Sequence, residues 1–433
     1  MSDDRVYGTQ PGSICANFEF NNNKQTDSWD ELAAFTATGT WNDDGYVAMA
    51  TPAIDDRIVR QSKEYYMAKS YKYNTALFTA ILNVETANTD NVAGEFGSTS
   101  RVGVFDDLSD KPETTDLGFF FEYTITDGAT VTATNPLQHP LKVGVRYNST
   151  ANTLGDTLVS QDSFNVNDLN RNTHISISEW SKIYTFEIKY NAIGHVEWAI
   201  YLDGERILLH KEQDISNIIH VLPKFNMPLR FELDNTTANG NTDTAVVPPV
   251  TYEMRQFHTS MICENGTTNP CNGWNAPPIM VYHLAPLTTS ELIYTIDTFS
   301  YEPIFSIRLK ADYIRDPIRL YEVMYLVHKR GPFIFAIIRN GTPSTASWQD
   351  PGSAYKLEYD VSSSSIGSTA DCIHEEYVDA NSGGVDHKQS KFELCLPPIT
   401  SSIDGTPDEF TIVARKMSVL KVTSHWQFRW TQD

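Results

Sequence analysis

The stretch YTFEIKYNAIGHVEWAIYLDGERILLH, residues 184–210, decides the fold class of this 433-residue chain. In residues 184–190, and again in 196–202, apolar and polar side chains alternate, which gives a β-strand one buried and one solvated face. Asn191–Gly194 separates the two runs as a turn. Asp203-Gly204 follows, and this dipeptide suits a two-residue type I′ hairpin turn because both central residues need positive φ. The stretch therefore predicts three consecutive antiparallel strands.

The rest of the chain repeats this strand pattern. Short runs rich in Val, Ile, Tyr, Phe and Thr are broken by Gly, Pro, Asn and Asp, without a sustained helical stripe of apolar residues. In a first block we expect further strands at 76–84, 102–105, 118–124, 142–147, 229–233 and 250–257. In a second block we expect them at 304–309, 320–328, 332–339, 354–359, 391–396, 409–415 and 425–430. The pattern predicts an all-β protein of two antiparallel β-sandwich domains with few helices.

Length and turn-forming residues predict where the domains meet. A chain of 433 residues exceeds one ordinary hydrophobic core. The polar segment 234–249 could be a linker, but an alternating run follows it, so we interpret it as a long hairpin loop. Two proline breaks, at Pro270 and Pro277-Pro278, place the boundary later. The expected order is an N-terminal arm at 1–30, a β-sandwich at 31–268, a linker at 269–288 and a C-terminal β-sandwich at 289–433.

The charge and the apolar runs exclude some classes of partner. Lys and Arg total 33 against 55 Asp and Glu, a net charge of −22, which repels nucleic acid and anionic membranes. The N-terminus shows neither a basic start nor an apolar run of signal-peptide length, so we expect synthesis in a cytoplasm. Apolar stretches such as Phe333–Ile338 are far shorter than the roughly 20 residues that span a bilayer.

Five cysteines are few for this length, and C-x-x-C zinc spacing is absent. Cys263 and Cys271 bracket one polar loop, while Cys372 and Cys395 bracket another. Both pairs could close as disulfides in an oxidising medium, whereas free buried thiols are expected in a cytosolic product.

Motifs that carry catalysis are missing. The chain has no G-x-S-x-G, no phosphate-binding G-x-x-x-x-G-K-[ST] and no G-x-G-x-x-G. A glycan-cleaving sandwich needs two carboxylates, and the nearest approach is Glu232-Leu233-Asp234, which lacks a further Glu and is interpreted as polar residues at a strand end. His374-Glu375-Glu376 begins like a zinc-protease helix without its second His, and we predict a solvated loop there.

Two acidic groups could bind calcium through their carboxylates. These are Asp43-Asp44, and Asp106-Asp107 with Asp110, but neither forms a regular calcium-binding loop. We interpret them as turn residues, with Asp106-Asp107 fixing a bend through side-chain-to-backbone hydrogen bonds. The sequence therefore predicts no catalytic residue, no cofactor and no metal site.

Several segments, taken in order, resemble one family of proteins. They are SRVGVFDD (100–107), GFFFEY (118–123), LVSQDSFNVN (158–167), the hairpins of 186–203, NMPLRFELDN (226–235), PIFSIRLK (303–310) and residues 408–415 with the closing Trp426. The ordered set resembles virion structural proteins of tailed phages and large double-stranded DNA viruses, whose central part is similar to concanavalin-A-like lectin sandwiches. The resemblance covers almost the whole chain and implies a jelly-roll or concanavalin-A-like fold. The chain departs from the family pattern by insertions at 110–116, 135–140, 237–248 and 369–388.

The resemblance implies a role in virion assembly and offers no catalytic residues. We expect a minor capsid, tail-associated or vertex-associated protein that is made in the host cytoplasm and resides in the virion. Its partners would be other virion proteins and, because particles are symmetric, copies of itself. A trimer is the expected assembly. The alternative is a glycan-binding, lectin-like module that recognises host surface glycans. Neither interpretation requires an enzyme.

Overall fold

The computed structural model divides the chain into two compact units, Met1–Thr268 and Asn269–Asp433. The structure describes residues 13–20, 23–26, 28–53, 55–67, 73–85, 98–106, 117–125, 141–148, 154–167, 182–191, 195–212, 226–235, 251–263, 282–284, 292–313, 318–327, 331–353, 355–369, 371–378, 388–393, 399–402, 405–419 and 422–432.

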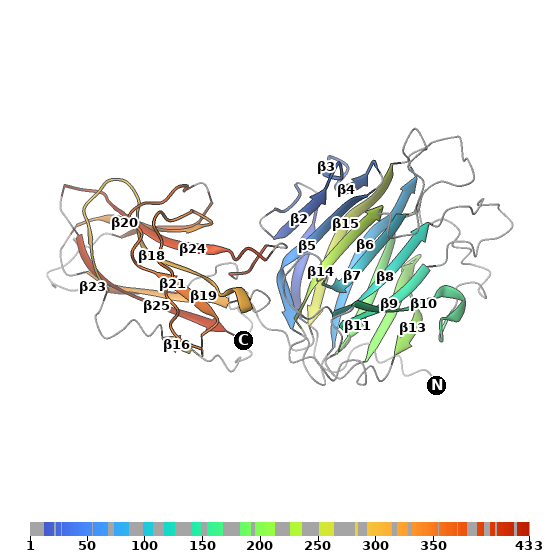
Figure 1. Cartoon of the computed structure of the whole chain (residues 1–433). Coiled ribbons are helices and arrows are strands. Elements are labelled where there is room, and N and C mark those ends of the chain that lie inside the picture. Colours follow the sequence, from blue (N-terminus) through green and yellow to red (C-terminus); the bar gives the residue numbers. More distant parts are fainter. Residues whose placement is uncertain are drawn as a thin grey trace. The chain divides into compact units, whose positions relative to one another are not determined.

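The first unit consists of two antiparallel β-sheets stacked face to face (Figure 1). One sheet contains β1 (Ser13–Glu19), β3 (Thr38–Asn42), β4 (Tyr46–Thr51), β6 (Asn74–Glu85), β11 (Tyr184–Tyr190), β12 (Val196–Leu202), β13 (Glu205–Glu212) and β15 (Tyr252–Cys263). Its order is β13-β12-β11-β6-β15-β4-β3, and β1 pairs with β15.

The other sheet of the first unit has seven strands. They are β2 (Trp29–Ala34), β5 (Asp56–Met67), β7 (Ser98–Phe105), β8 (Leu117–Ile125), β9 (Leu141–Asn148), β10 (Leu154–Ser160) and β14 (Asn226–Asn235). Their order is β10-β9-β8-β7-β14-β5-β2. A short 3-10 turn, Gln161–Ser163, follows β10.

The core of the first unit forms where the apolar faces of the two sheets meet. Phe186 and Tyr190 of β11 are fully buried and contact rings from β8. The ring centroids of Phe121 and Phe186 lie 5.1 Å apart, and those of Phe119 and Tyr190 lie 5.5 Å apart. Such aromatic pairs stabilise the interface beyond the area that they bury.

The three strands predicted at residues 184–210 are confirmed. β11, β12 and β13 are consecutive antiparallel neighbours. Asp203 and Gly204 have φ values of 50° and 84°, as a type I′ turn requires. Trp198 is buried in β12, where the alternation placed it.

The second unit also pairs two antiparallel sheets. One contains β16 (Tyr282–Leu284), β17 (Leu292–Ile296), β19 (Ile318–Val327), β23 (Lys388–Glu393) and β25 (Val422–Gln432), in the order β16-β25-β19-β23 with β17 also on β25. The other contains β18 (Glu302–Leu309), β20 (Phe333–Arg339), β21 (Leu357–Asp360), β22 (Cys372–Val378) and β24 (Glu409–Lys416), in the order β21-β18-β24-β20-β22. A 3-10 turn, Ala311–Tyr313, follows β18. Phe335 and Trp426, whose ring centroids are 5.7 Å apart, connect the two sheets in the core.

The all-β class and its antiparallel sandwiches are confirmed, but three local expectations are corrected. Residues 13–19, assigned to an N-terminal arm, form β1 because they find hydrogen-bonding partners along β15 of the same unit. Residues 282–284, assigned to the linker, form β16 on β25. Segment 234–249 is no hairpin loop, because β14 and β15 on its two sides belong to different sheets. In the ranges that the structure describes, no helix is long and apolar enough to cross a membrane.

Candidate functional site

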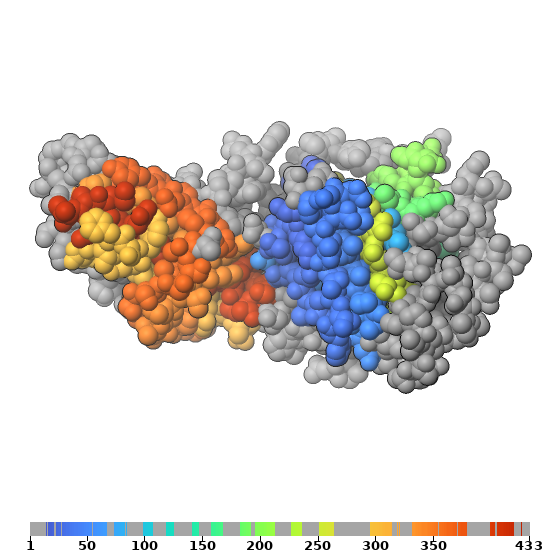
Figure 2. All heavy atoms as spheres, turned by 90° about the horizontal axis from the view of Figure 1, so that it is seen from above, coloured from blue at the N-terminus to red at the C-terminus, as the bar shows by residue number. Residues whose placement is uncertain are grey.

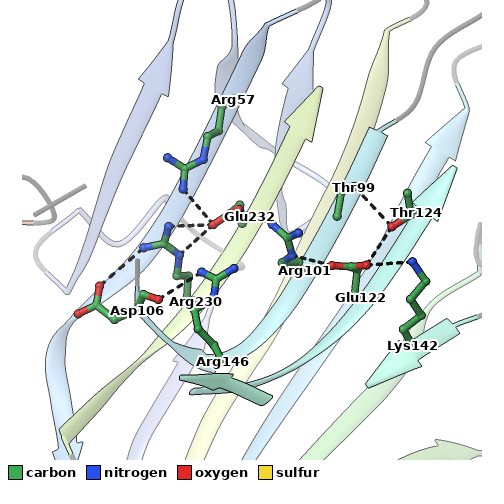
Figure 3. Close-up of polar contacts among 10 residues, drawn as sticks. All are labelled: Arg57, Thr99, Arg101, Asp106, Glu122, Thr124, Lys142, Arg146, Arg230 and Glu232. Atoms are coloured by element: carbon green, nitrogen blue, oxygen red, sulfur yellow. Dashed lines mark hydrogen bonds and ion pairs between the residues drawn. The ribbon is translucent and has the colours of Figure 1, made fainter. Parts of the chain in front are cut away.

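A concentration of buried charge lies on the seven-stranded sheet, on the face turned away from the eight-stranded sheet. Leu229, Phe231 and Leu233 of β14 point into the core, so Arg230 and Glu232 point to the opposite face. Neighbouring strands add side chains to that face (Figure 3). We define the charged cluster as Arg57, Arg101, Asp106, Glu122, Lys142, Arg146, Arg230 and Glu232.

Glu232 is the centre of the charged cluster. Its Oε2 accepts hydrogen bonds from Arg230 Nη2 at 2.8 Å and from Arg57 Nη2 at 3.2 Å. Its Oε1 accepts one from Arg101 Nη1 at 2.9 Å. The side chain is 1% exposed. Charge-assisted hydrogen bonds of this kind are the strong ones, and here they occupy both carboxylate oxygens.

Glu122 of β8 is held in the same way. Arg101 Nε donates to its Oε2 at 2.8 Å, and Lys142 Nζ donates to its Oε1 at 3.2 Å. Thr124 Oγ1 also donates to Oε1, at 3.1 Å. Arg101 therefore connects the two buried glutamates through different nitrogens of one guanidinium group (Figure 3).

Asp106 extends the charged cluster beyond the end of β7. Its Oδ2 accepts a hydrogen bond from the Tyr65 hydroxyl at 3.2 Å, and its Oδ1 lies 3.9 Å from Arg230 Nη1. Arg146 Nη1 donates to the Asp106 carbonyl oxygen at 3.2 Å. The Asp106 side chain thus contacts residues of other strands, and its expected role as a turn residue bonded to nearby backbone stays a prediction.

Neighbouring cationic side chains offset the desolvation of Glu232 and Glu122. Burial alone would raise the pKa of Glu232, but Arg57, Arg230, Arg101 and Arg146 hold that pKa well below its usual value. Burial opposes ionisation of Glu122 as well, yet Arg101 and Lys142 lower its pKa. Both carboxylates therefore remain ionised at neutral pH.

Aromatic rings form a floor beneath the guanidinium groups. Arg146 Cζ lies 5.2 Å from the ring centroid of Phe105 and 5.5 Å from that of Phe120. Arg230 Cζ lies 5.3 Å from Phe105, and Arg101 Cζ lies 5.8 Å from Phe120. Cation–π attraction at these distances stabilises the arginines where water is excluded.

Phe120 fits because its cross-strand neighbours are glycines. It lies directly opposite Gly103 of β7 and Gly144 of β9. A Cβ atom at Gly144 would lie 2.3 Å from the Phe120 Cζ, and one at Gly103 would lie 2.2 Å from the Phe119 carbonyl oxygen. The row of small, large and small residues lets the ring lie against the sheet.

The accessible part of the charged cluster is cationic. The side chains of Arg57, Arg101 and Lys142 are 18%, 16% and 24% exposed, whereas those of Glu232 and Glu122 are 1% and 3% exposed. A general acid would need a carboxyl group with a raised pKa and access to substrate, and Glu122 and Glu232 have neither. The geometry fits a rigid surface on which the partly exposed ends of Arg57, Arg101 and Lys142, called the cationic tips, face solvent.

A second group of polar side chains lies in the second unit. Ile307 and Phe410 point into its core, so Arg308 and Glu409, which are direct partners across β18 and β24, point to the outer face. Arg308 donates to Glu358 from Nε at 3.0 Å and from Nη2 at 2.9 Å. The Trp348 ring centroid lies 4.1 Å from the Arg308 Cζ.

Asp360 supplies a second carboxylate to this group. It is buried and accepts hydrogen bonds from the backbone nitrogens of Ser347, Ser362 and Ser363 at 2.9, 3.0 and 3.1 Å. Desolvation opposes its charge, but these bonds and the serine hydroxyls lower the pKa of Asp360. Its negative charge therefore persists close to Glu409.

Glu409 makes the second unit sensitive to pH. Burial, supplemented by repulsion from Asp360, raises the pKa of Glu409 to about 7. The folded state then holds a proton that the unfolded chain releases near pH 4.5, so stability falls as the pH rises from about 4.5 to 7. After a discount for partial exposure, we expect a loss of about 1–2 kcal/mol across this window. Glu409→Gln should remove it, measured by urea unfolding between pH 5 and pH 8.

Glu358→Gln is the matched control for this prediction. It removes a carboxylate from β21, which pairs with β18 on the side away from β24, and should leave the pH dependence of unfolding in place. Hydrogen exchange assigns the change to peptides of the second unit. Identical pH profiles for the unsubstituted chain and for Glu409→Gln would contradict the prediction.

The cysteine predictions remain predictions. Cys263 is buried at the end of β15 and Cys372 is exposed at the start of β22. Cys271 and Cys395, their proposed partners, lie outside the described residues.

One expected loop is an ordered strand, and one expected strand end lies inside a strand. His374-Glu375-Glu376 lies in β22, where Glu375 accepts a hydrogen bond from the Tyr301 hydroxyl at 2.6 Å. Alternation is weak there because much of β22 is exposed on both faces, which is why the sequence pattern indicated a loop. Glu232, interpreted as a polar residue at a strand end, lies inside β14 at the centre of the charged cluster.

The acidic groups show no metal site in the described part of the chain. There, no group of three or more His, Cys, Asp and Glu side chains is placed to hold a metal ion. Near Asp43-Asp44, the turn is stabilised by Asn42, whose Oδ1 accepts from the Asp44 backbone nitrogen at 3.0 Å. Asp107 and Asp110 lie outside the described residues, and the prediction that neither acidic group binds a metal stays a prediction.

The charged cluster could have been suspected from the sequence. Arg101, Glu122, Arg230 and Glu232 are charged residues inside runs that otherwise predict strongly buried strands. Opposite charges on neighbouring strands are a signal for cross-strand pairing. The sequence does not show which strands are neighbours, so the pairing itself required the structure.

Known structures share the β-sandwich class of this chain. A lectin from Bauhinia forficata in complex with GalNAc is 10% identical, with a TM-score of 0.32, and the match covers 58% of this chain and 98% of the lectin. The catalytic domain of an endo-1,3-β-glucanase (laminarinase) from Thermotoga petrophila is 10% identical, with a TM-score of 0.36 and coverage of 59% and 100%. The Crh5 transglycosylase is 13% identical, with a TM-score of 0.34 and coverage of 60% and 89%. No family model and no curated protein matches the chain.

Proposed function

We propose that this chain is a non-enzymatic virion structural protein that acts through protein–protein contacts in particle assembly. The proposal that the chain is not an enzyme rests on the charged cluster, in which the two buried glutamates are fully hydrogen-bonded to cationic side chains. Both carboxylate oxygens of Glu232 and of Glu122 accept hydrogen bonds from cationic side chains, and both pKa values are lowered. Neither group can supply or remove a proton at neutral pH.

Exposed apolar side chains support a role in contacts. Phe35 is 83% exposed in the first unit, while Phe299 and Val419 are 60% and 85% exposed in the second. All three lie in turns between strands. Exposed aromatic and aliphatic groups on rigid turns are suited to insert into a partner surface.

The virion assignment itself rests on the ordered segments of residues 100–107, 158–167 and 226–235 and on the acidic charge, which keeps subunits dispersed before assembly. The test is mass spectrometry of purified virus particles combined with electron microscopy. The proposal expects this chain among the particle proteins and density for two β-sandwiches at a defined position. Its absence from intact, purified particles that derive from the same genome would overturn the assignment.

Glycan binding is a second candidate, favoured by the cationic tips. Arg57, Arg101 and Lys142 are partly exposed, and guanidinium and ammonium groups bind the carboxylate or sulfate of an acidic sugar. A glycan array with acidic and neutral glycans tests this. Binding confined to acidic glycans and weakened in Lys142→Ala supports the candidate, and an array without hits removes it.

A further inference from the structure

Phe35 is placed unfavourably for an isolated chain. It lies in the turn between β2 and β3, which closes with a hydrogen bond from Ala37 N to Ala34 O at 3.2 Å. Its side chain is 83% exposed, and its φ is 57°. A residue other than Gly, Asn or Asp rarely adopts this left-handed region, and a bulky one is an outlier there. Phe35 therefore combines a solvated phenyl ring with a strained backbone.

The turn that presents Phe35 is rigidly held. Asp56 is fully buried at the start of β5. Its Oδ1 accepts from Thr36 N at 2.9 Å, and its Oδ2 accepts from Thr36 Oγ1 at 2.7 Å and from Ala53 N at 2.8 Å. These bonds fix the residue next to Phe35 and so set the direction of the phenyl ring. Such pre-organisation lowers the entropy that a contact would otherwise cost.

We propose that Phe35 is an anchor for self-association, inserted between this chain and a second copy of itself. The strained backbone and the exposed ring at Phe35 cost free energy in the isolated unit. Burial of the ring at an interface offsets that cost. This proposal rests on the proposed function, because a virion is assembled from repeated copies of its proteins. It names the surface through which two copies meet.

Local charge favours a second copy at this position. Two chains of net charge −22 repel each other unless they meet where charge is already balanced. Along β2, the strand that leads into the Phe35 turn, Glu31 pairs with Arg60 at 2.8 Å and with Lys24 at 3.3 Å, and Asp30 pairs with Lys63 at 3.6 Å. The acids of β2 are thus neutralised within the same chain.

Sheet topology supplies a second argument for self-association. β2 ends the seven-stranded sheet and β3 ends the eight-stranded sheet in the described part of the chain, and the Phe35 turn connects them. Edge strands offer unpaired backbone groups that pair with another chain. In Figure 2 the N-terminal strands of the first unit, drawn in blue, form one continuous surface. A two-fold arrangement would bring two such edges and two Phe35 rings together.

Three variants of the full chain test the proposal. Phe35→Gly removes the ring and relieves the strain, Phe35→Ala removes the ring and keeps the strain, and Phe299→Ala removes an exposed ring from the other unit. Sedimentation velocity over a range of concentrations should show self-association of the unsubstituted chain and of Phe299→Ala. Both Phe35 variants should weaken it about tenfold or more, as expected for loss of one buried ring. Phe35→Gly should also melt at a higher temperature than Phe35→Ala.

A photo-crosslinker identifies the contact directly. p-Benzoylphenylalanine at position 35 should form crosslinks to peptides of a second copy in purified protein. A chain that stays monomeric at all concentrations, or Phe35 variants that associate like the unsubstituted chain, would overturn the anchor. Crosslinks only to other proteins in purified particles would also overturn it, while leaving the virion assignment intact. Absence of the chain from particles would remove that assignment without affecting self-association in solution.

Discussion

Replacing Glu232 with Gln should destabilise the first unit by about 3–5 kcal/mol, because it leaves several buried cations without their counter-charge. Glu232 binds Arg57, Arg101 and Arg230, and the Arg230 side chain is completely buried. A neutral amide keeps the shape but removes the attraction that offsets their desolvation. Urea unfolding of the full chain measures the loss, and hydrogen exchange should locate it in peptides of β7 and β14.

Glu358→Gln provides the comparison for this experiment. Its pair with Arg308 is about a third exposed on each side, so we expect a loss below about 1 kcal/mol. Similar small losses for both variants would show that the charged cluster is not a coupled unit.

The direction of the Glu232 pKa also predicts acid sensitivity. Because its pKa is held well below the usual value in the folded state, its stabilising contribution is present above about pH 4.5 and is lost as the pH falls. The Glu232→Gln variant should therefore approach the stability of the unsubstituted chain in acid. A difference in the free energy of unfolding between the two chains that stays constant from pH 7 to pH 3 would contradict this prediction.

Much of the fold could be predicted because period-two alternation reports the buried face of a strand directly. Residues 184–202 alternate cleanly, and the structure pairs them as expected. The pattern does not predict β5 because Arg60 and Gln61 interrupt its apolar run. Both are nevertheless buried, and each hydrogen-bonds to a residue of another strand. β2 was missed because Asp30 and Glu31 occupy positions at a sheet edge, where the core imposes little pattern.

The charged cluster depends on which strands are neighbours, and local sequence does not contain that information. Arg101 and Glu232 are separated by 131 positions, and they meet only because β7 and β14 are paired. Phe35 illustrates another limit, because a positive φ at a non-glycine residue follows from the surrounding hydrogen bonds and has no compositional signal. Sequence alone therefore predicts layers better than it predicts sites.

Replacing Gly144 with Ala should destabilise the first unit by about 2–3 kcal/mol, although Ala is normally the better residue inside a strand. The new Cβ would lie 2.3 Å from Cζ and 2.5 Å from Cε2 of Phe120. That ring is fully buried and has Arg101 and Arg146 above it, so it has little room to move. Urea unfolding measures the change in the free energy of unfolding. A loss of stability indicates that Phe120 crowds the site, whereas Gly144→Ala at an uncrowded site would gain stability.

A double-mutant cycle with Phe120→Ala tests the mechanism. Phe120→Ala should itself cost about 3–5 kcal/mol because it leaves a cavity beneath the guanidinium groups. In that background the space beside Gly144 is open, so Gly144→Ala should cost less than about 0.5 kcal/mol or become favourable. Equal costs in both backgrounds would place the conflict in the backbone of β9 and not in the Phe120 ring. The expected coupling instead ties the glycine row to the aromatic floor, and through that floor to the positions of Arg101 and Arg146 on which the cationic surface depends.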